Sequence, residues 1–156
     1  MLTDPSHTPS LHASETLHAT CVAIGGRGVL IFGQSGAGKS DLALRLIDRG
    51  AALVSDDYTI VSAENGALFA RAPANIAGKM EVRGLGIVPF PAVLQAPVAM
   101  AIELSATTDR LPEPRLRHIL GIAVAAFSLN SHEASAPIKA EIAMRMAAAG
   151  GQETCR

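Results

Sequence analysis

The stretch that decides the fold of this 156-residue chain is GVLIFGQSGAGKS, which runs from Gly28 to Ser40. Its first part, 28–32, is an apolar run of the length and composition typical of a buried strand. The segment 41–49 has apolar residues at helical spacing and is followed by Gly50, which predicts an amphipathic helix with a glycine stop. The sequence therefore predicts a strand, a glycine-rich loop and a helix in this order.

The loop between this strand and this helix, 33–40, fits the phosphate-binding P-loop at each fixed position. Its glycines let successive backbone N–H groups close around a phosphate, and the helix N-terminus adds a positive dipole end. We expect Lys39 to neutralise phosphate oxygens and the Ser40 hydroxyl to bind Mg²⁺. The predicted nucleotide-binding residues are Gly33, Gln34, Ser35, Gly36, Ala37, Gly38, Lys39 and Ser40.

Length and composition favour one compact domain. The chain is 49% hydrophobic and 17% charged, which suffices for one core, and it is too short for two ordinary domains. Pro5 and Pro9 interrupt a polar stretch, so we predict a flexible leader over 1–16. A single domain is expected over 17–150, followed by a tail over 151–156.

Charge and cysteine content narrow the classes of function. The net charge is −1, which favours neither nucleic acid nor an anionic membrane as a partner. Aromatic residues make up 3% of the chain, which argues against a base-stacking surface. The two cysteines, Cys21 and Cys155, have no metal-ligand or disulfide spacing. Because no apolar stretch reaches the roughly 18 residues of a membrane helix, we expect a cytoplasmic protein.

Strand and helix signals alternate irregularly along the rest of the chain, which indicates an α/β domain with a mixed sheet. The apolar segment 51–57 predicts a buried strand that ends in Asp56 and Asp57, where catalytic groups are often found. Asn65-Gly66, between two apolar runs, predicts a hairpin. Further predictions are a hairpin of 17–24 with the P-loop strand, strands at 98–104 and 119–127, and a helix at 134–149 that ends before Gly150-Gly151.

Four further motifs stand at defined distances from the P-loop. Ser55-Asp56-Asp57 centres seventeen residues beyond Lys39, and MEVRGLGI occupies 80–87. His18 lies fifteen residues before Gly33, and Asp109-Arg110-Leu111 lies downstream. In this arrangement the sequence from about His18 to Leu111 resembles the catalytic domain of the HPr kinase/phosphorylase family, and MEVRGLGI looks like that family's signature.

The resemblance implies a P-loop kinase fold of the phosphoenolpyruvate carboxykinase-like type, with a mixed β-sheet and flanking helices. It implies ATP- and Mg²⁺-dependent phosphorylation of a serine on HPr, a small carrier protein of the bacterial phosphotransferase system, and also phosphorolysis of the seryl phosphate. It further implies a homo-oligomer, usually a hexamer in the family. The chain resembles the short form of the family, which is reduced to the catalytic domain.

The resemblance also assigns roles to three carboxylates. Asp56 matches the base that accepts the proton of the attacking serine hydroxyl. Asp57 would support the metal, and Glu81 matches a second Mg²⁺ ligand after the Ser40 hydroxyl. The residues alone leave alternatives open: the two aspartates could form a solvated turn or only hold metal, and Glu81 could form an ordinary ion pair with Arg83.

Four basic side chains complete the expected catalytic set, and Lys39 of the P-loop is the first of them. Arg83 and Arg110 would spread their donors over the oxygens of the transferring phosphoryl group. His18 matches a family histidine that binds or polarises phosphate. Surface arginines and a structural histidine are the alternatives that the residues leave open.

Two other functions compete with a protein kinase. A nucleotide-sensing module would bind ATP and a partner protein without efficient transfer, but it would not need the set of Asp56, Glu81 and Arg110. A small-molecule kinase would need a lid with several arginines, and no arginine-rich insertion follows the P-loop helix.

Overall fold

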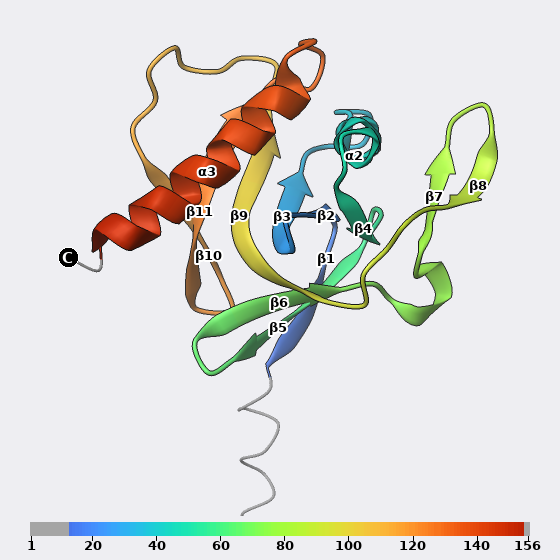
Figure 1. The fold of residues 1–156 in the computed structure, drawn as a ribbon, viewed down its shortest axis with the longest axis horizontal. Helices are drawn as coiled ribbons and strands as arrows, with labels where there is room; N and C mark the ends of the chain where they lie inside the picture. The colour runs from blue at the N-terminus through green and yellow to red at the C-terminus, as the bar shows by residue number, and fades with distance from the viewer. Residues whose placement is uncertain (1–12, 155–156) are drawn as a thin grey trace, which may run out of the picture.

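The computed structural model describes residues 13–154, in which strands outnumber helices (Figure 1). Strands and helices alternate irregularly along this part of the chain, and the predicted α/β class with a mixed sheet is confirmed. The elements are β1 (Ser14–Leu17), β2 (Thr20–Ile24), β3 (Arg27–Phe32), α2 (Lys39–Asp48), β4 (Ala52–Ser55), β5 (Thr59–Glu64), β6 (Ala67–Arg71), η2 (Ala74–Ile76), β7 (Lys79–Val82), β8 (Gly86–Pro89), β9 (Ala96–Leu104), β10 (Arg115–Ile119), β11 (Ile122–Leu129) and α3 (Ala136–Thr154).

One nine-stranded mixed sheet forms the centre of the molecule, and β7 and β8 form a separate hairpin. The strand order is β1-β5-β6-β9-β3-β2-β4, and β11 joins the sheet beside β9, with β10 at its outer edge. β3, β9 and β11 are parallel, and β4 shares their direction because β3 and β4 are both antiparallel to β2. The carboxyl ends of these four strands therefore meet at one edge of the sheet, where α/β proteins carry their binding sites.

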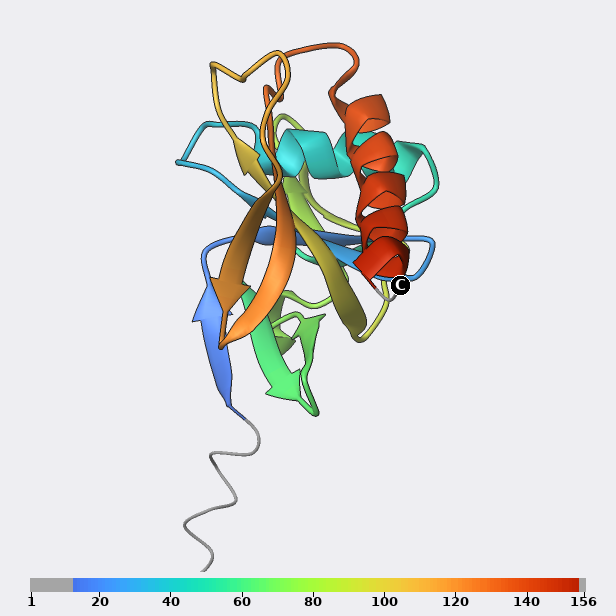
Figure 2. The same cartoon turned by 90° about the vertical axis from the view of Figure 1, so that its left-hand side faces the viewer.

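Both faces of the central strands are buried, which explains the unbroken apolar run of β3. Side chains alternate between the two faces of a strand, so Val29 and Ile31 pack with Leu42 in the cluster beneath the helices. Leu30 points to the opposite face and packs in a second cluster that includes Val61 of β5. Figure 2 shows α2 and α3 on the same side of the sheet. This double burial fixes the position of the loop that follows β3.

Both predicted hairpins are present. β2 and β3 pair antiparallel with Cys21 opposite Leu30, and β5 and β6 pair on either side of Asn65-Gly66. Asn65 and Gly66 have φ angles of 52° and 81°, as a two-residue hairpin turn of the primed type requires. The strand predicted at 98–104 is also found, as the greater part of β9.

The strand predicted at 119–127 is confirmed only over 122–127, which lie in β11, because its start belongs to the end of β10 and to the turn of the β10–β11 hairpin. Leu120 and Gly121 form its turn with φ angles of 51° and 78°. The turn was not predicted because Leu120 at its first position is apolar, so the apolar pattern typical of a strand continues through the turn. Of β10, only Ile119 lies within the predicted strand.

The predicted end of the last helix is also wrong. α3 continues to Thr154, through Gly150-Gly151, and it includes most of the predicted tail. Glycine weakens a helix by about 1 kcal/mol and stops it only when the backbone leaves the helical region. Cys155 and Arg156 lie outside the described residues.

The predicted leader extends too far, because 14–17 form β1, which pairs antiparallel with β5. The remaining leader residues up to 12 lie outside the described part of the chain. Within 13–154, no helix combines the length and the apolar character that crossing a membrane requires.

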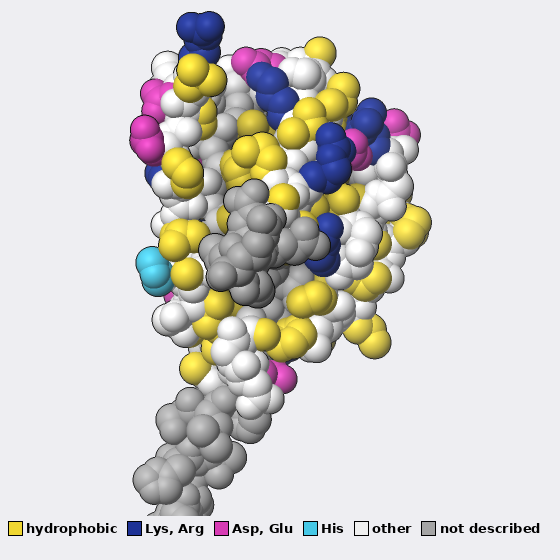
Figure 3. All heavy atoms as spheres, turned by 60° about the vertical axis from the view of Figure 1, so that its left-hand side comes forward, with side chains coloured by type: hydrophobic (Ala, Val, Ile, Leu, Met, Phe, Trp, Pro, Cys, Tyr) yellow, Lys and Arg dark blue, Asp and Glu magenta, His cyan; other side chains and the backbone are white. Residues whose placement is uncertain are grey.

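The surface on the side of β10, β11 and α3 is mixed in character. Figure 3 shows Lys and Arg side chains on this face among Asp, Glu and hydrophobic side chains. No broad area of one charge sign covers the face in this view, which agrees with the net charge of −1.

Candidate active site

The P-loop connects β3 to α2, and local hydrogen bonds fix its shape. The Ala37 N–H donates to the Gln34 carbonyl at 2.9 Å, and the Leu42 N–H donates to the Gly38 carbonyl at 2.9 Å, which begins α2. Gly36 and Gly38 have φ angles of 83° and 99°, in the region that favours glycine. The predicted strand, loop and helix are therefore confirmed, and the positive end of α2 lies at the loop.

Lys39 is the first residue of α2, and only 6% of its surface is exposed. Its Nζ donates to the Gly33 carbonyl at 2.8 Å and to the Gln34 carbonyl at 3.3 Å. These bonds hold the ammonium group against the loop, and it forms no ion pair within 13–154. A buried ammonium is expensive without an opposite charge, so the site is suited to an anion such as a phosphate.

A carboxylate lies directly beside the P-loop. The Ser40 hydroxyl donates to Asp56 Oδ1 at 2.6 Å, and the buried Thr20 hydroxyl donates to the same oxygen at 3.3 Å. Asp56 follows β4 and Thr20 begins β2, two neighbouring strands. The sheet thus brings the first predicted carboxylate to the predicted Mg²⁺-binding hydroxyl.

Asp57 points to a different partner. Its Oδ1 lies 3.0 Å from His18 Nε2, and its backbone N–H donates to the Thr20 hydroxyl at 3.1 Å. Asp57 has a φ of 70°, in the left-handed region that few residues other than glycine adopt. The His18 ring also stacks on Tyr58, with ring centroids 5.0 Å apart. The structure thus pairs His18 with Asp57, whereas Ser40 contacts Asp56.

Three predicted residues lie outside this cluster. Glu81 is on β7, Arg83 is in the turn before β8, and Arg110 is in the segment 105–114; all three are exposed. None of them forms an ion pair within the described residues, so the alternative pairing of Glu81 with Arg83 is absent there. Figure 1 shows the β7–β8 hairpin and the segment between β9 and β10 extending outwards from the central sheet.

Two residues that support the P-loop, one directly and one through the segment after β11, were not predicted from the sequence. The Ser131 hydroxyl, after β11, donates to the Ala37 carbonyl at 2.6 Å, and Ser131 is 4% exposed. The Arg45 guanidinium on α2 donates to the carbonyls of Ser131 and Glu133 and pairs with Asp41 at 2.9 Å. Arg45 thereby holds the segment that supports the loop, and no local motif marks either residue.

The oxygen atoms beside the P-loop fit a metal ion that is bound by the protein and by nucleotide phosphates together. No group of three or more His, Cys, Asp or Glu side chains that could hold a metal occurs in residues 13–154. Mg²⁺ bound with a nucleotide commonly takes just one or two protein ligands. Ser40 Oγ and Asp56 Oδ1, 2.6 Å apart, supply hard oxygen atoms at the mouth of the loop.

Glu103 anchors the segment that carries Arg110. Its carboxylate accepts hydrogen bonds from Arg115 at 2.7 Å and from Arg117 at 2.8 Å. Partial burial alone would raise the pKa of Glu103, but the two guanidinium groups outweigh burial and hold this pKa below its ordinary value. The Arg117 guanidinium also lies 3.7 Å from the centre of the Phe32 ring, at the start of the P-loop.

A comparison with protein families agrees with this arrangement. The family model described as the HPr serine kinase C-terminal domain matches residues 9–129. The chain belongs to this family. Among solved structures, the HPr(Ser) kinase/phosphatase from Coxiella burnetii is similar, with a TM-score of 0.78 and 32% identity. That match covers 88% of this chain and 99% of the other, and it confirms the predicted P-loop kinase fold.

Curated HPr kinase/phosphorylases are similar over part of their length. The protein of Clostridium beijerinckii is 49% identical over 77 residues, which are 49% of this chain and 26% of that protein. The protein of Clostridium tetani is 46% identical over 82 residues, which are 52% of this chain and 27% of that protein. The matched region thus spans about a quarter of these HPr kinase family members.

Proposed function

We propose that this chain is the catalytic domain of an ATP- and Mg²⁺-dependent kinase that phosphorylates a serine of an HPr-like phosphocarrier protein. The observation that carries the proposal is the 2.6 Å contact between Ser40 Oγ and Asp56 Oδ1. This contact joins the P-loop to a carboxylate that can accept a proton. Family membership and the names of the similar proteins support the class of substrate.

ATP would bind through its phosphates. The backbone N–H groups of the P-loop and the N-terminus of α2 favour an anion at this position. Lys39, now bonded to two loop carbonyls, would turn its Nζ to the phosphate oxygens. All the groups that we propose for binding the ATP phosphates therefore lie in the P-loop and at the start of α2.

Asp56 would act as the base. Its Oδ1 accepts hydrogen bonds from the Ser40 and Thr20 hydroxyls, while Oδ2 has no hydrogen-bond partner among residues 13–154. As the carrier's serine oxygen attacks the γ-phosphorus, its proton passes to Asp56, and the bond from the γ-phosphorus to the bridging oxygen breaks to release ADP. The two fixed bonds to Oδ1 keep this carboxylate oriented for the transfer.

Mg²⁺ would be held by the Ser40 hydroxyl, whose proton is directed to Asp56, with Glu81 as second ligand and Asp57 in support. When bound, the ion neutralises phosphate charge. Arg83 and Arg110 would contact the oxygens of the transferring group from the two exposed segments that carry them.

His18 supports removal of the phosphate by phosphorolysis. In this reaction inorganic phosphate attacks the seryl phosphorus, the bond from phosphorus to the serine oxygen breaks, Asp56 returns a proton to the serine oxygen, and pyrophosphate is released. The His18 imidazole would bind the incoming phosphate, and Asp57, 3.0 Å away, would orient its ring. The Tyr58 ring stacked on His18 limits the rotation of the imidazole further. We also propose a cytoplasmic homo-oligomer with no nucleic acid or membrane partner.

Incubation of the purified chain with γ-labelled ATP, Mg²⁺ and HPr-like carriers tests the proposal. We expect mass spectrometry to find one phosphoserine on the carrier, absent when that serine is replaced by alanine or when Mg²⁺ is chelated. Tight ATP binding without any phosphoserine would contradict the kinase and favour the nucleotide-sensing module. The oligomeric state is measured on the same sample by light scattering.

A further inference from the structure

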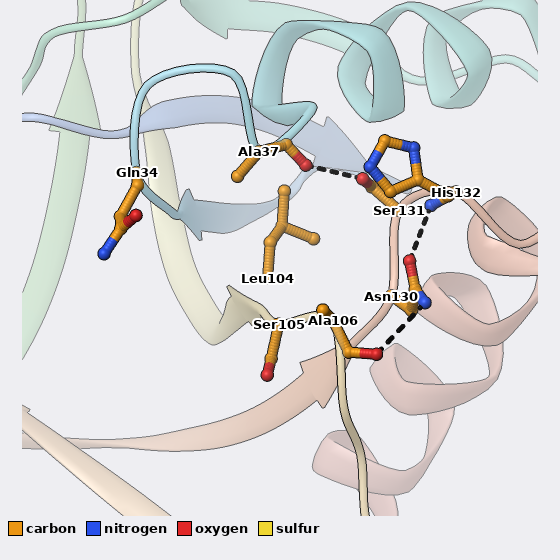
Figure 4. Close-up of a pocket in the computed structure, with 8 residues that line it drawn as sticks. All are labelled: Gln34, Ala37, Leu104, Ser105, Ala106, Asn130, Ser131 and His132. Carbon is orange, nitrogen blue, oxygen red and sulfur yellow. Dashed lines mark hydrogen bonds between the residues drawn. The ribbon is translucent and has the colours of Figure 1, made fainter.

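A pocket adjoins the P-loop on the side away from Asp56. It has a volume of about 380 Å³, within the range of roughly 300–1,000 Å³ that is usual for small-molecule sites. Gln34 and Ala37 of the P-loop line one wall, and Asn130 and His132 line the wall after β11. Figure 4 shows Leu104, at the end of β9, between these walls.

The strand order fixes where this pocket stands relative to the catalytic carboxylate. β3 lies between β2 and β9, and its carboxyl end continues into the P-loop. Asp56 lies beyond β2, at the end of β4, whereas the pocket lies at the ends of β9 and β11. A triphosphate on the loop with its γ-phosphate at Asp56 therefore directs its other end to the pocket.

The lining of the pocket differs in chemistry from the P-loop. None of its lining residues is a lysine, an arginine or a carboxylate, so the pocket has no permanently charged side chain to pair with a phosphate. Leu104, Ala37 and Ala106 supply apolar surface, while Asn130 supplies polar groups. Small-molecule sites commonly combine apolar walls with a few fixed polar groups. A flat, uncharged, heteroaromatic group fits this lining better than a further phosphate does.

Asn130 is held in place by two bonds. Its Oδ1 accepts from the His132 N–H at 2.9 Å, and its Nδ2 donates to the Ala106 carbonyl at 3.4 Å (Figure 4). The His132 ring forms no hydrogen bond with any other described residue and is exposed at the pocket. The amide can therefore present its remaining donor and acceptor capacity to a ligand, and the ring is free to stack on a base.

We propose that this pocket binds the nucleoside of the bound nucleotide, with the base against Leu104 and His132 and its polar edge at Asn130. The inference rests on the proposed kinase function, which sets the direction of the triphosphate. It assigns a task to the segment after β11, which the proposed transfer chemistry does not use.

Calorimetric titration with ATP and with inorganic tripolyphosphate separates the nucleoside from the phosphates. In Ala106→Trp, whose indole fills the pocket, and in His132→Ala, which removes the ring, we expect ATP affinity to fall about tenfold, the scale of a lost base stack. Tripolyphosphate affinity should stay at the wild-type value in both variants. His118→Ala, an exposed histidine on β10, is the matched control and should leave both affinities unchanged.

Each of the other results overturns the inference in a recognisable way. Unchanged ATP affinity in both variants, or equal losses for ATP and tripolyphosphate with unchanged thermal unfolding, would place the nucleoside elsewhere. Equal affinities of the wild-type chain for both ligands would remove the pocket's contribution and leave the kinase proposal intact. A wild-type chain that binds neither ligand would overturn the kinase proposal and this inference with it.

Discussion

The P-loop and the two exposed segments around it differ in how the chain holds them. Lys39 bonds to two carbonyls of the loop itself, while Ser40 and Ser131 bond the loop to the segments that follow β4 and β11. Arg83 and Arg110, on the β7–β8 hairpin and in the segment 105–114, form no ion pair within residues 13–154. The difference leads us to expect that the proposed nucleotide site is already formed in the folded chain, whereas the two arginines that we propose for the transferred phosphate need substrate to bring them together.

Lys39→Ala disrupts the P-loop, the first of the two regions compared, and should have the largest effect. Removal of the ammonium leaves the phosphate charge without its main cation, so we expect transfer to fall on the order of 10³-fold and ATP affinity to fall with it. The transfer rate and calorimetric affinity measure the two losses. Lys139→Ala, an exposed lysine paired with Glu133, is the control and should match the wild type. Normal transfer by Lys39→Ala would contradict the role of the loop.

Arg110→Ala tests the second region, the exposed segment 105–114. Because Arg110 forms no ion pair with the P-loop residues in the described part of the chain, we expect unchanged ATP affinity and a fall of kcat on the order of 10²-fold. Steady-state kinetics with the carrier protein, beside ATP titration, separates the two quantities. Arg27→Ala, at the opposite edge of the sheet, is the control. A loss of ATP affinity as large as the loss of kcat would show that the two regions are not distinct.

Gly38→Ala sharpens the comparison by testing how tightly the loop is fitted. A Cβ at this position would lie 2.4 Å from Ser131 Oγ, and the φ of 99° disfavours alanine. We expect the free energy of unfolding to fall by about 2 kcal/mol, measured by urea denaturation. Gly50→Ala is the matched control, because Gly50 has a similar φ of 109° but open space around it. Equal losses in both variants would attribute the effect to backbone strain alone.

Glu103→Gln should have the smallest effect, because it weakens only the ion pairs of Glu103 with Arg115 and Arg117 at the ends of the segment 105–114. The two arginines lower the pKa of Glu103, so its stabilisation is present above the ordinary glutamate pKa of about 4.3 and disappears as the pH falls through the lower folded value. We expect a loss of about 0.5 kcal/mol at pH 7 that shrinks in acid, measured by urea denaturation across pH. Glu15→Gln on β1 is the control, and a pH-independent loss would contradict the charge pairing.

The sequence predicted those parts of the site that lie in one continuous motif or at one strand end. The P-loop and its flanking elements needed only local patterns, and Asp56 was found because a buried strand ends directly before it. The Asn65-Gly66 turn was also predicted from a local pattern, since both residues tolerate the positive φ that the turn needs.

The remaining features depend on packing between distant segments. Ser131 reaches the P-loop across 94 residues of sequence, and nothing near it predicts the contact. The turn at Leu120-Gly121 was missed because an apolar residue occupies its first position. The stacking of Tyr58 on His18 depends on the pairing of β1 with β5, which places Leu17 opposite Thr59, and no local pattern predicts it.

Replacement of Asp56 by asparagine tests the central claim most directly, when transfer and binding are measured on the same protein. The amide keeps the shape of the side chain but cannot accept the serine proton, so we expect nearly normal ATP affinity and no phosphoserine on the HPr-like carrier. Asp48→Asn, an exposed aspartate on α2, should transfer phosphate as the wild type does. Transfer at the wild-type rate by Asp56→Asn would contradict the account.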